Sequence, residues 1–362
     1  MILVHICCSV DSHFFLQKLK KVYPHDELIG FFYDPNIHPY SEYYLRLQDV
    51  KRSCKKLGIK LIEGEYDFHN WLKCVRGYEN EPEKGARCDI CFDKRLEVSA
   101  KKASELGAEF LTTTLLTSPK KSIDQLKFSG EKIASKYDLR FLCVDFRVGG
   151  GTTEQFALAK KDKLYHQDYC GCIYALSKQR DYQDKLMDEM FSPISKQIQP
   201  ESIEERINLY KKVYDLEEKD IKFEIVRESF LNYRLLRGFL RQNKEVIPAH
   251  IVPYSTTKRK FVKFKIEKNI KDIYFANREN IRLIKLSKYN QIINKNYKNI
   301  KELIYNTPSY EDEILLRNKI DFNIHSLSTI LVVEDIEKLA KYELYLESKT
   351  YEDVKEYLVT FR

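Results

Sequence analysis

The chain has 362 residues, of which 43% are hydrophobic and 32% charged, and its formal net charge is +8. This length exceeds one ordinary hydrophobic core and predicts two domains. The composition is that of a globular protein, and no run of about 18 apolar residues could span a bilayer. The first residues, MILVHIC, form a strand-like segment without a basic leader or a cleavage site. We therefore expect a cytoplasmic protein with no membrane partner.

Short apolar runs alternate with helical periodicities through the first half of the chain. Strands are expected over residues 2–7, 28–33, 60–64, 110–116 and 141–146. Helices are expected over residues 12–22, 41–57, 68–75, 89–106 and 123–137. This alternation predicts an α/β fold, a Rossmann-like three-layer parallel sheet with helices on both faces. In such a sheet, ligands collect beyond the carboxyl ends of the strands.

The alternation breaks where Pro193 and Pro200 flank a polar stretch, which we interpret as a linker over residues 191–200. It divides an α/β catalytic domain, 1–190, from a C-terminal α+β extension, 191–362. Within the extension we expect helices over residues 203–216 and 229–242, a basic strand over 259–266, and a helix-rich end from residue 292 onward.

The extension is strongly basic. From Lys222 to Lys301 there are 20 Lys and Arg against 6 Asp and Glu, with tyrosines scattered among them. Such an excess favours a polyanion or a membrane surface as partner, and tyrosines can stack on bases, so RNA binding is the hypothesis. A Lys, Asn and Ile-rich genome would explain the same composition without a function.

Six of the nine cysteines form three close pairs: Cys7 with Cys8, Cys88 with Cys91, and Cys170 with Cys172. In a reducing compartment, such pairs indicate metal or redox chemistry rather than structural disulfides. The second pair shares one face at the start of a predicted helix, so both sulfurs can reach one metal. Zinc, a thioredoxin-like motif and an iron–sulfur cluster all use this spacing. A polar segment before the pair disfavours thioredoxin, and the adjacent sulfurs of the first pair suit a cubane cluster.

Asp11 lies at the predicted start of the first helix, where a carboxylate either caps the helix or serves as an oxygen ligand to an exposed iron. A disulfide between Cys170 and Cys172 would close a small, strained ring, and strained disulfides are readily reduced. This pair is therefore predicted to relay electrons or, alternatively, to ligate metal. Two buried thiols beside a turn glycine are the simplest structural explanation.

Together these motifs resemble the cobalamin-independent epoxyqueuosine reductases, iron–sulfur enzymes of transfer-RNA queuosine synthesis. The resemblance rests on HICCSVDS (5–12), YDPNIHPYSEYYLR (33–46), RCDICFDKRL (87–96), TTTLLTSP (112–119), DFR (145–147) and YCGCIYALS (169–177). It covers nearly all of residues 1–180. Val10 stands where the family often has proline, and Asp11 places the chain in the aspartate variety. Residues 191–362 have no recognised counterpart in the shorter family members.

The resemblance implies an oxidoreductase that reduces epoxyqueuosine to queuosine at the wobble position of transfer RNA, taking electrons from a donor such as a ferredoxin. It implies a [4Fe-4S] cluster on Cys7, Cys8, Cys88 and Cys91, and leaves open one additional iron. Asp11 would ligate that iron or deliver a proton, and Cys170 and Cys172 would form a redox-active disulfide. We assign substrate binding to Tyr33, Asn36, His38, Arg46 and Arg147. For His38 a fixed place between loops, and for Arg46 an ion pair with Glu42, are the structural alternatives.

Two other functions stay open. An ATP-dependent transfer-RNA thiolation enzyme would share the predicted sheet, but its glycine-rich phosphate loop is replaced here by CSVDS at residues 8–12. A non-catalytic, zinc-stabilised RNA-binding module would use the basic extension. Iron with acid-labile sulfide, rather than zinc alone, would exclude the module.

Overall fold

A computed structural model of the chain describes residues 1–119, 121–191, 193–323 and 325–361. The chain forms two compact units. The first contains Met1–Met190 and Arg206–Phe223 together with the end of the chain from Thr360, and the second contains Phe191–Glu205 and Glu224–Val359. The segment from 206 to 223 thus belongs to the first unit although it follows the predicted linker. Ser192, within that linker, lies outside the described residues.

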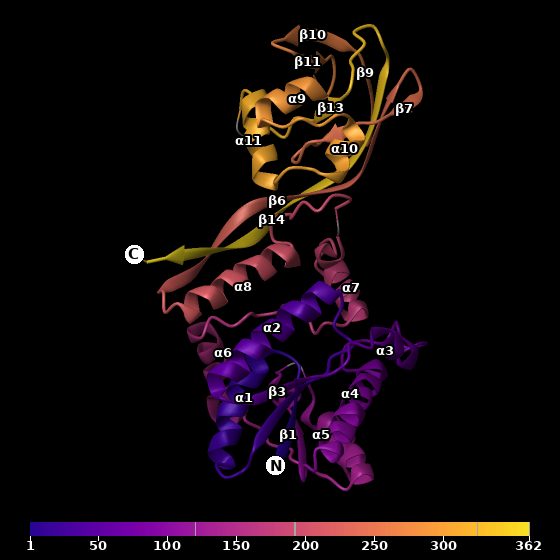
Figure 1. Cartoon of the computed structure of the whole chain (residues 1–362). Helices are drawn as coiled ribbons and strands as arrows, with labels where there is room; N and C mark the ends of the chain where they lie inside the picture. The colour runs from indigo at the N-terminus through magenta and orange to yellow at the C-terminus, as the bar shows by residue number, and fades with distance from the viewer. Residues whose placement is uncertain (120, 192, 324, 362) are drawn as a thin grey trace. The chain divides into compact units, whose positions relative to one another are not determined.

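The first unit is built on a parallel five-stranded sheet (Figure 1). Its order is β3-β2-β1-β4-β5, the order of doubly wound nucleotide-binding folds. All five residues of the central strand β1 are buried, as expected for a strand covered on both faces. The strands are β1 (Ile2–Ile6), β2 (Leu28–Phe32), β3 (Lys60–Glu63), β4 (Phe110–Thr113) and β5 (Arg140–Phe141).

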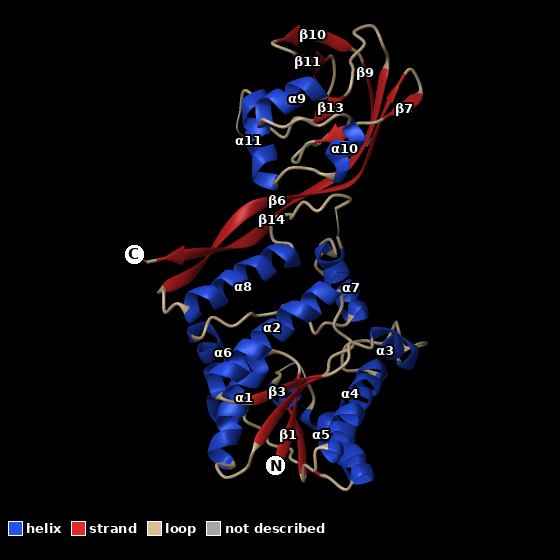
Figure 2. Ribbon diagram, in the orientation of Figure 1, coloured by secondary structure: helices blue, strands red, loops and turns tan. Residues whose placement is uncertain are grey.

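Helices cover both faces of this sheet (Figure 2). One face carries α1 (Ser9–Val22) and α2 (Tyr40–Leu57), which pack on each other, and the other carries α4 (Ala86–Glu105) and α5 (Ile123–Ala134). The remaining helices of this part of the chain are α3 (Phe68–Cys74), α6 (Gly151–Lys161), α7 (Ile173–Tyr182) and α8 (Ile203–Glu218). The predicted three-layer α/β class is confirmed.

The fifth strand is shorter than predicted. A strand was expected over residues 141–146, but β5 ends at Phe141, and only the amide of Leu142 continues the pairing, with the Leu111 carbonyl at 2.9 Å. α5 packs tightly against this strand, since a Cβ built on Gly130 would lie 2.4 Å from the Phe141 ring. The apolar run beyond Phe141 packs against the core without pairing, which explains why it reads as a strand in the sequence.

The described residues of the second unit form two sheets, with the helices α9, α10 and α11 beside them (Figure 2). The five-stranded sheet has the order β10-β11-β12-β13-β8, and the four-stranded sheet has the order β7-β6-β14-β9. Its strands are β6 (Phe223–Gln242), β7 (Glu245–Ile247), β8 (His250–Ile251), β9 (Phe261–Phe264), β10 (Ile266–Ile270), β11 (Ile273–Ala276), β12 (Arg282–Lys285), β13 (Ile330–Val333) and β14 (Tyr342–Thr360). The helices are α9 (Leu286–Ile293), α10 (Ile300–Tyr305) and α11 (Tyr310–Ile320).

Two predictions for this unit were wrong. Residues 229–242 form most of the strand β6 instead of a helix, and the supposedly helix-rich end contains β13 and the long strand β14. β6 lies between β7 and β14 in the sheet, so partners distant in sequence satisfy its backbone and override a locally helix-like pattern. The predicted α+β class of the extension is confirmed. No helix in the described ranges is long and apolar enough to cross a membrane.

Candidate active site

The dicysteine lies in the turn at the carboxyl end of the central strand. β1 ends at Ile6 and α1 begins at Ser9, so Cys7 and Cys8 occupy the connection. The Cys7 sulfur lies 3.9 Å from the Cys8 sulfur and 3.8 Å from Oδ2 of Asp11. The three candidate ligand atoms are all within 4.8 Å of one another. A soft sulfur pair and a hard oxygen are thus gathered at the sheet edge where this fold binds ligands.

Asp11 does not cap the first helix. The helix begins earlier than predicted, with Cys8 at the cap position and no side-chain capping bond. The Asp11 carboxylate accepts a hydrogen bond from Nε2 of Gln155 at 2.7 Å, while its other oxygen faces Cys7. Burial raises the pKa of Asp11 to about 6, against the opposing effect of hydrogen bonds from Cys8 and Gln155. The capping explanation is therefore wrong, and the carboxylate is held toward the cysteines.

The other two cysteine pairs reach the same cavity. This cavity has a volume of about 250 Å³ and lies within the first unit. Cys88 and Cys91 come from the start of α4, and burial raises the pKa of both thiols. The sulfur-bearing and carboxylate residues among its lining include Cys7, Asp11, Cys88, Cys91, Cys170 and Cys172. Three segments far apart in the sequence therefore meet at one place.

Two of the cations in the lining, Arg95 and Lys121, lie close to cysteines. Arg95 is buried and forms an ion pair with Asp34. Burial by itself would lower the pKa of Arg95. The larger opposing effect of Asp34, Cys91 and Cys7 raises this pKa overall, so the guanidinium stays charged. Lys121 pairs with Glu83 at 3.1 Å. Burial is again outweighed, because Glu83 and the neighbouring cysteines, Cys170 foremost, raise the pKa of Lys121.

Cys170 and Cys172 are free thiols on either side of Gly171. Gly171 has a φ of 102°, and a Cβ there would lie 2.7 Å from the side chain of Ile37, so only glycine fits this turn. A hydrogen bond from the Cys172 thiol, with help from Lys121, lowers the pKa of Cys170 to about 5. The same bond, together with burial, raises the pKa of Cys172. The pair therefore combines one thiolate with one protonated thiol.

Arg46 fixes the backbone of this cysteine loop. Its guanidinium donates to the carbonyls of Tyr169 and Cys170, at 2.9 and 3.3 Å. Nε donates to Glu42 at 2.7 Å, and the second oxygen of Glu42 accepts a hydrogen bond from the Tyr165 hydroxyl. The pairing of Arg46 with Glu42 is therefore present, and both side chains are buried. The same guanidinium also lines the cavity.

The five residues assigned to substrate binding separate into two groups. Asn36 and Arg46 line the cavity, whereas Tyr33, His38 and Arg147 are not part of its lining. The Tyr33 hydroxyl donates to Asp67 at 2.7 Å, and the His38 ring stacks on Phe68 with centroids 4.5 Å apart.

Arg147 is held by Asp145 and by two backbone carbonyls in the connection before α5. Its guanidinium therefore forms hydrogen bonds within the protein and lies outside the cavity lining.

The polar residues of the site that the sequence interpretation missed include Arg95, Lys121 and Gln155. Arg95 and Lys121 line the cavity, and Gln155 holds Asp11 from α6. Arg95 had a recognisable signal, since it follows the C-x-x-C pair by one helical turn and shares a face with Cys91. Lys121 follows the TTTLLTSP motif closely. No local pattern singles out Gln155.

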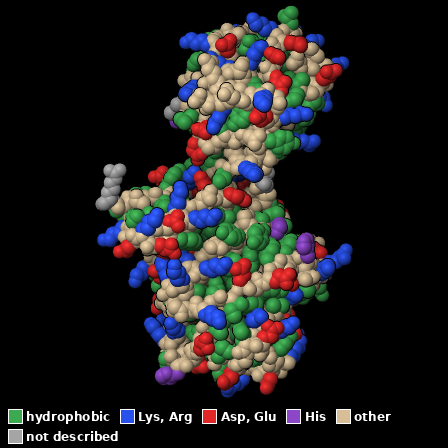
Figure 3. All heavy atoms as spheres, in the orientation of Figure 1, with side chains coloured by type: hydrophobic (Ala, Val, Ile, Leu, Met, Phe, Trp, Pro, Cys, Tyr) green, Lys and Arg blue, Asp and Glu red, His purple; other side chains and the backbone are tan. Residues whose placement is uncertain are grey.

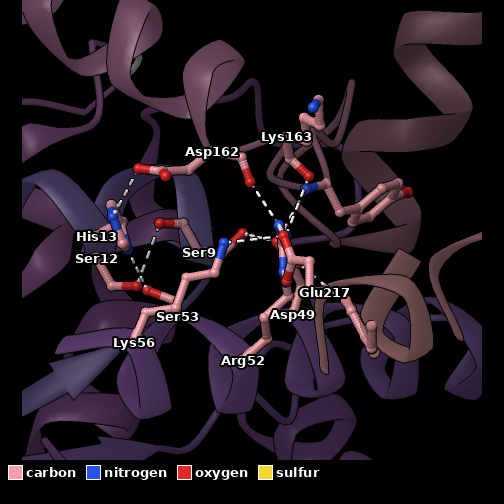
Figure 4. Close-up of polar contacts among 12 residues, drawn as sticks. Ser9, Ser12, His13, Asp49, Arg52, Ser53, Lys56, Asp162, Lys163 and Glu217 are labelled. Carbon is pink, nitrogen blue, oxygen red and sulfur yellow. Dashed lines mark hydrogen bonds and ion pairs between the residues drawn. The ribbon is translucent and has the colours of Figure 1, made fainter. Parts of the chain in front are cut away.

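A buried polar network fixes the turn just beyond the dicysteine (Figure 4). Asp49 of α2 is fully buried and accepts hydrogen bonds from the Ser9 hydroxyl, from Arg52 at 2.9 Å, from the Tyr165 amide at 2.8 Å and from the Tyr214 hydroxyl at 3.2 Å.

Arg52 extends the network to α8 through Glu217, and to the carbonyls of Asp162 and Lys163 (Figure 4). α8 is thus tied to the helix that starts beside Cys8.

A Rossmann-like sheet with thiols, a carboxylate and buried cations beyond its strand ends defines an α/β enzyme suited to redox chemistry at sulfur or metal. Comparison with known proteins makes the assignment specific. Residues 2–178 match the family described as epoxyqueuosine reductase QueH. The chain is 41% identical over 350 residues to epoxyqueuosine reductase QueH of Helicobacter pylori, covering 92% of this chain and 94% of the relative.

The Acinetobacter baylyi epoxyqueuosine reductase QueH is 38% identical over 176 residues, which cover 48% of this chain and 80% of the relative. A solved structure of the U34-tRNA thiolase NcsA from Methanococcus maripaludis with its [4Fe-4S] cluster aligns with a TM-score of 0.34 and 16% identity, over 59% of this chain and 72% of that one.

The chain belongs to the epoxyqueuosine reductase QueH family and is an oxidoreductase. The predicted family and enzyme class are thereby confirmed, in preference to a thiolation enzyme or a non-catalytic zinc module. The Helicobacter pylori alignment spans almost the whole chain, so the second unit has a counterpart in that relative.

Proposed function

We propose that the protein reduces epoxyqueuosine to queuosine in the wobble position of transfer RNA. The observation that carries the proposal is the convergence of Cys7, Asp11 and two further cysteine pairs on one cavity in a member of this family. The residues fit an iron–sulfur cluster, because Cys7, Cys88 and Cys91 line one cavity and the Cys8 sulfur lies 3.9 Å from that of Cys7. The charged Arg95 lies beside Cys91 and Cys7 and would offset the negative charge of thiolate ligands. We expect the protein to act in the cytoplasm.

In this proposal Cys7, Cys8, Cys88 and Cys91 hold a [4Fe-4S] cluster, and Asp11 either ligates an adjoining iron or delivers a proton. When bound, the cluster supplies electrons and the iron supplies Lewis acidity. Removing the epoxide oxygen breaks two carbon–oxygen bonds, forms the ring double bond and releases the oxygen as water, with two electrons and two protons consumed.

The thiol pair of the third cysteine motif supplies these reducing equivalents in a balanced way. Oxidation of the Cys170 thiolate and the Cys172 thiol to a disulfide releases two electrons and one proton. The second proton comes from solvent, and an external donor such as a ferredoxin reduces the disulfide again. The lowered pKa of Cys170 maintains a thiolate beside a protonated partner, and Arg46 holds the loop carbonyls. Lys121 faces both the cluster cysteines and this pair, which stabilises negative charge during the reduction.

The test combines metal analysis with a mass assay. Anaerobically purified protein should contain iron and acid-labile sulfide, and should convert epoxyqueuosine in transfer RNA to a product lighter by one oxygen. Cys88→Ser should lose iron and activity, whereas Cys74→Ser, which changes an exposed cysteine outside the cavity, should lose neither. Zinc in place of iron, or full activity of Cys88→Ser, would refute the proposal.

The disulfide role has its own experiment. The Cys170→Ser variant should retain iron, but its reduction of epoxyqueuosine should stop once the electrons already stored in the protein are used. In the oxidised wild type, alkylation followed by mass spectrometry should detect a disulfide between Cys170 and Cys172. Multiple turnover by Cys170→Ser would contradict this role.

A further inference from the structure

The four-stranded sheet of the second unit has one buried and one exposed face. Along β9, Val262 and Phe264 are buried, while Phe261 and Lys263 point outward. β14 shows the same alternation in register, since Tyr345 lies directly opposite Phe261. The exposed face of an antiparallel sheet normally carries polar side chains. This face carries aromatic rings among its charged side chains.

The rings form a row across three neighbouring strands. Phe239 of β6 stacks on Tyr345 of β14 with centroids 5.4 Å apart and planes 5° apart, and Phe261 of β9 follows in the next strand. Phe261 is 42% exposed. Exposed aromatic residues on adjacent strands form the platform on which RNA-binding sheets stack unpaired bases.

A cation accompanies each ring of the row. Arg237 lies 5.4 Å from the centroid of Tyr345, Arg241 5.1 Å from that of Phe239, and Lys263 5.6 Å from that of Phe261. Such pairs hold the rings in place and bring positive charge to where the phosphates of a stacked strand would pass.

Two hollows adjoin the row and supply further positive charge. Their volumes are about 630 and 770 Å³, and both are lined by Lys263 and Arg278. The acidic residues in their lining are Glu279 and Glu343, and Glu343 already pairs with Lys263 at 3.0 Å. Six lining cations have no ion-pair partner in the described part of the chain: Lys244, Lys258, Arg259, Lys265, Arg278 and Lys341. Figure 3 shows Lys and Arg side chains spread over the surface of this unit.

We propose that this aromatic–basic face, formed by Phe239, Tyr345, Phe261 and the two adjoining hollows, binds RNA through base stacking and phosphate contacts. The inference deepens the proposed function and rests on it for the identity of the RNA as transfer RNA. An acidic protein would also be attracted by the cations. An acidic protein has no bases to stack on a row of aromatic rings that lie on neighbouring strands. RNA can use both the rings and the cations, so RNA is the partner that the face fits.

The experiment measures binding of an unmodified transfer-RNA transcript to the full-length protein by fluorescence anisotropy over a range of salt concentrations. Lys265→Glu combined with Arg278→Glu should weaken binding about tenfold or more and make the salt dependence shallower by about two charges. Phe261→Ala should weaken binding about fivefold with an unchanged salt slope, because stacking carries little salt dependence.

Lys288→Glu combined with Lys301→Glu is the matched control, because it makes the same change in net charge on helices of the same unit that do not line the hollows. Its binding should stay within about twofold of the wild type. Equal losses in the control and the face variant would overturn the proposal, as would binding by the face variant within twofold of the wild type. Polyglutamate and polyuridylate can each be tested as competitors of the transcript. If polyglutamate competes as effectively as polyuridylate, the face binds acidic partners in general and the proposal is overturned.

Steady-state reduction of epoxyqueuosine in transfer RNA separates this inference from the proposed function. The face variants should raise KM for transfer RNA with kcat unchanged, because they do not alter the cavity of the first unit. A wild-type protein that binds the transcript but never reduces epoxyqueuosine would refute the proposed function and leave the RNA-binding face standing. Normal KM in every face variant would refute the face and leave the function standing.

Discussion

Replacing Asp49 with alanine should destabilise the first unit strongly. The carboxylate is fully buried and is the common acceptor for Ser9, Arg52, Tyr165 and Tyr214. Removing one partner of a buried ion pair typically costs about 3–5 kcal/mol, because the remaining charge is left uncompensated. Glu217 still pairs with Arg52, which favours the lower end, so we expect a loss of about 3 kcal/mol.

The chain provides a reporter confined to the unit concerned. Its single tryptophan, Trp71, is fully buried in the first unit, so tryptophan fluorescence in urea follows this unit and not the second. With an m-value of about 3 kcal/mol/M, the expected loss moves the midpoint down by about 1 M.

Ser9→Ala removes one donor and leaves the charges paired, so it should cost only about 1 kcal/mol. A midpoint for Asp49→Ala within about 0.3 M of the wild type would refute the reasoning, as would equal losses in the two variants.

Three further predictions follow from the first unit. Arg46→Ala should reduce the rate of multiple turnover at least about tenfold, because the carbonyls of Tyr169 and Cys170 lose their hydrogen-bond donor. A variant that retains iron and turns over at the wild-type rate would contradict this prediction. Gly130→Ala should lower the urea midpoint, because the new methyl group would overpack against Phe141 and reduce the free energy of unfolding by about 1–3 kcal/mol. This loss should exceed the gain from the better helix propensity of alanine. A higher midpoint would show that Phe141 moves aside and would contradict the prediction. Burial raises the pKa of Cys54 to about 12, so iodoacetamide at pH 8 should label exposed Cys74 in the native protein and leave Cys54 unlabelled until urea is added.

The parallel α/β unit was predictable because its signals are local. The strand ILVHI is apolar throughout, as a central parallel strand must be, and the C-x-x-C spacing places two sulfurs on one helical face. Right-handed crossovers then bring the carboxyl ends of parallel strands to one edge. The hypothesis of one site for the three cysteine pairs drew on the family resemblance as well, and five of the six cysteines line one cavity.

Non-local pairing determined what the sequence could not. Residues 229–242 became a strand because β7 and β14 satisfy their backbone, and β14 begins a hundred residues further along the chain. The alternation that places the half-buried Phe239 and Tyr345 on the outer face of the sheet depends on that same pairing and register. No one-dimensional pattern reports it.

The sequence by itself determined that the chain would form a parallel α/β unit with two adjacent cysteines at the end of β1. Only the tertiary structure decided which polar side chains serve those sulfurs. Gln155 and Lys121 approach from segments more than a hundred residues away from Asp11, and the early start of α1 frees Asp11 from capping. Contacts of this kind follow from how helices pack on the sheet, which is a property of the whole core and not of any short stretch.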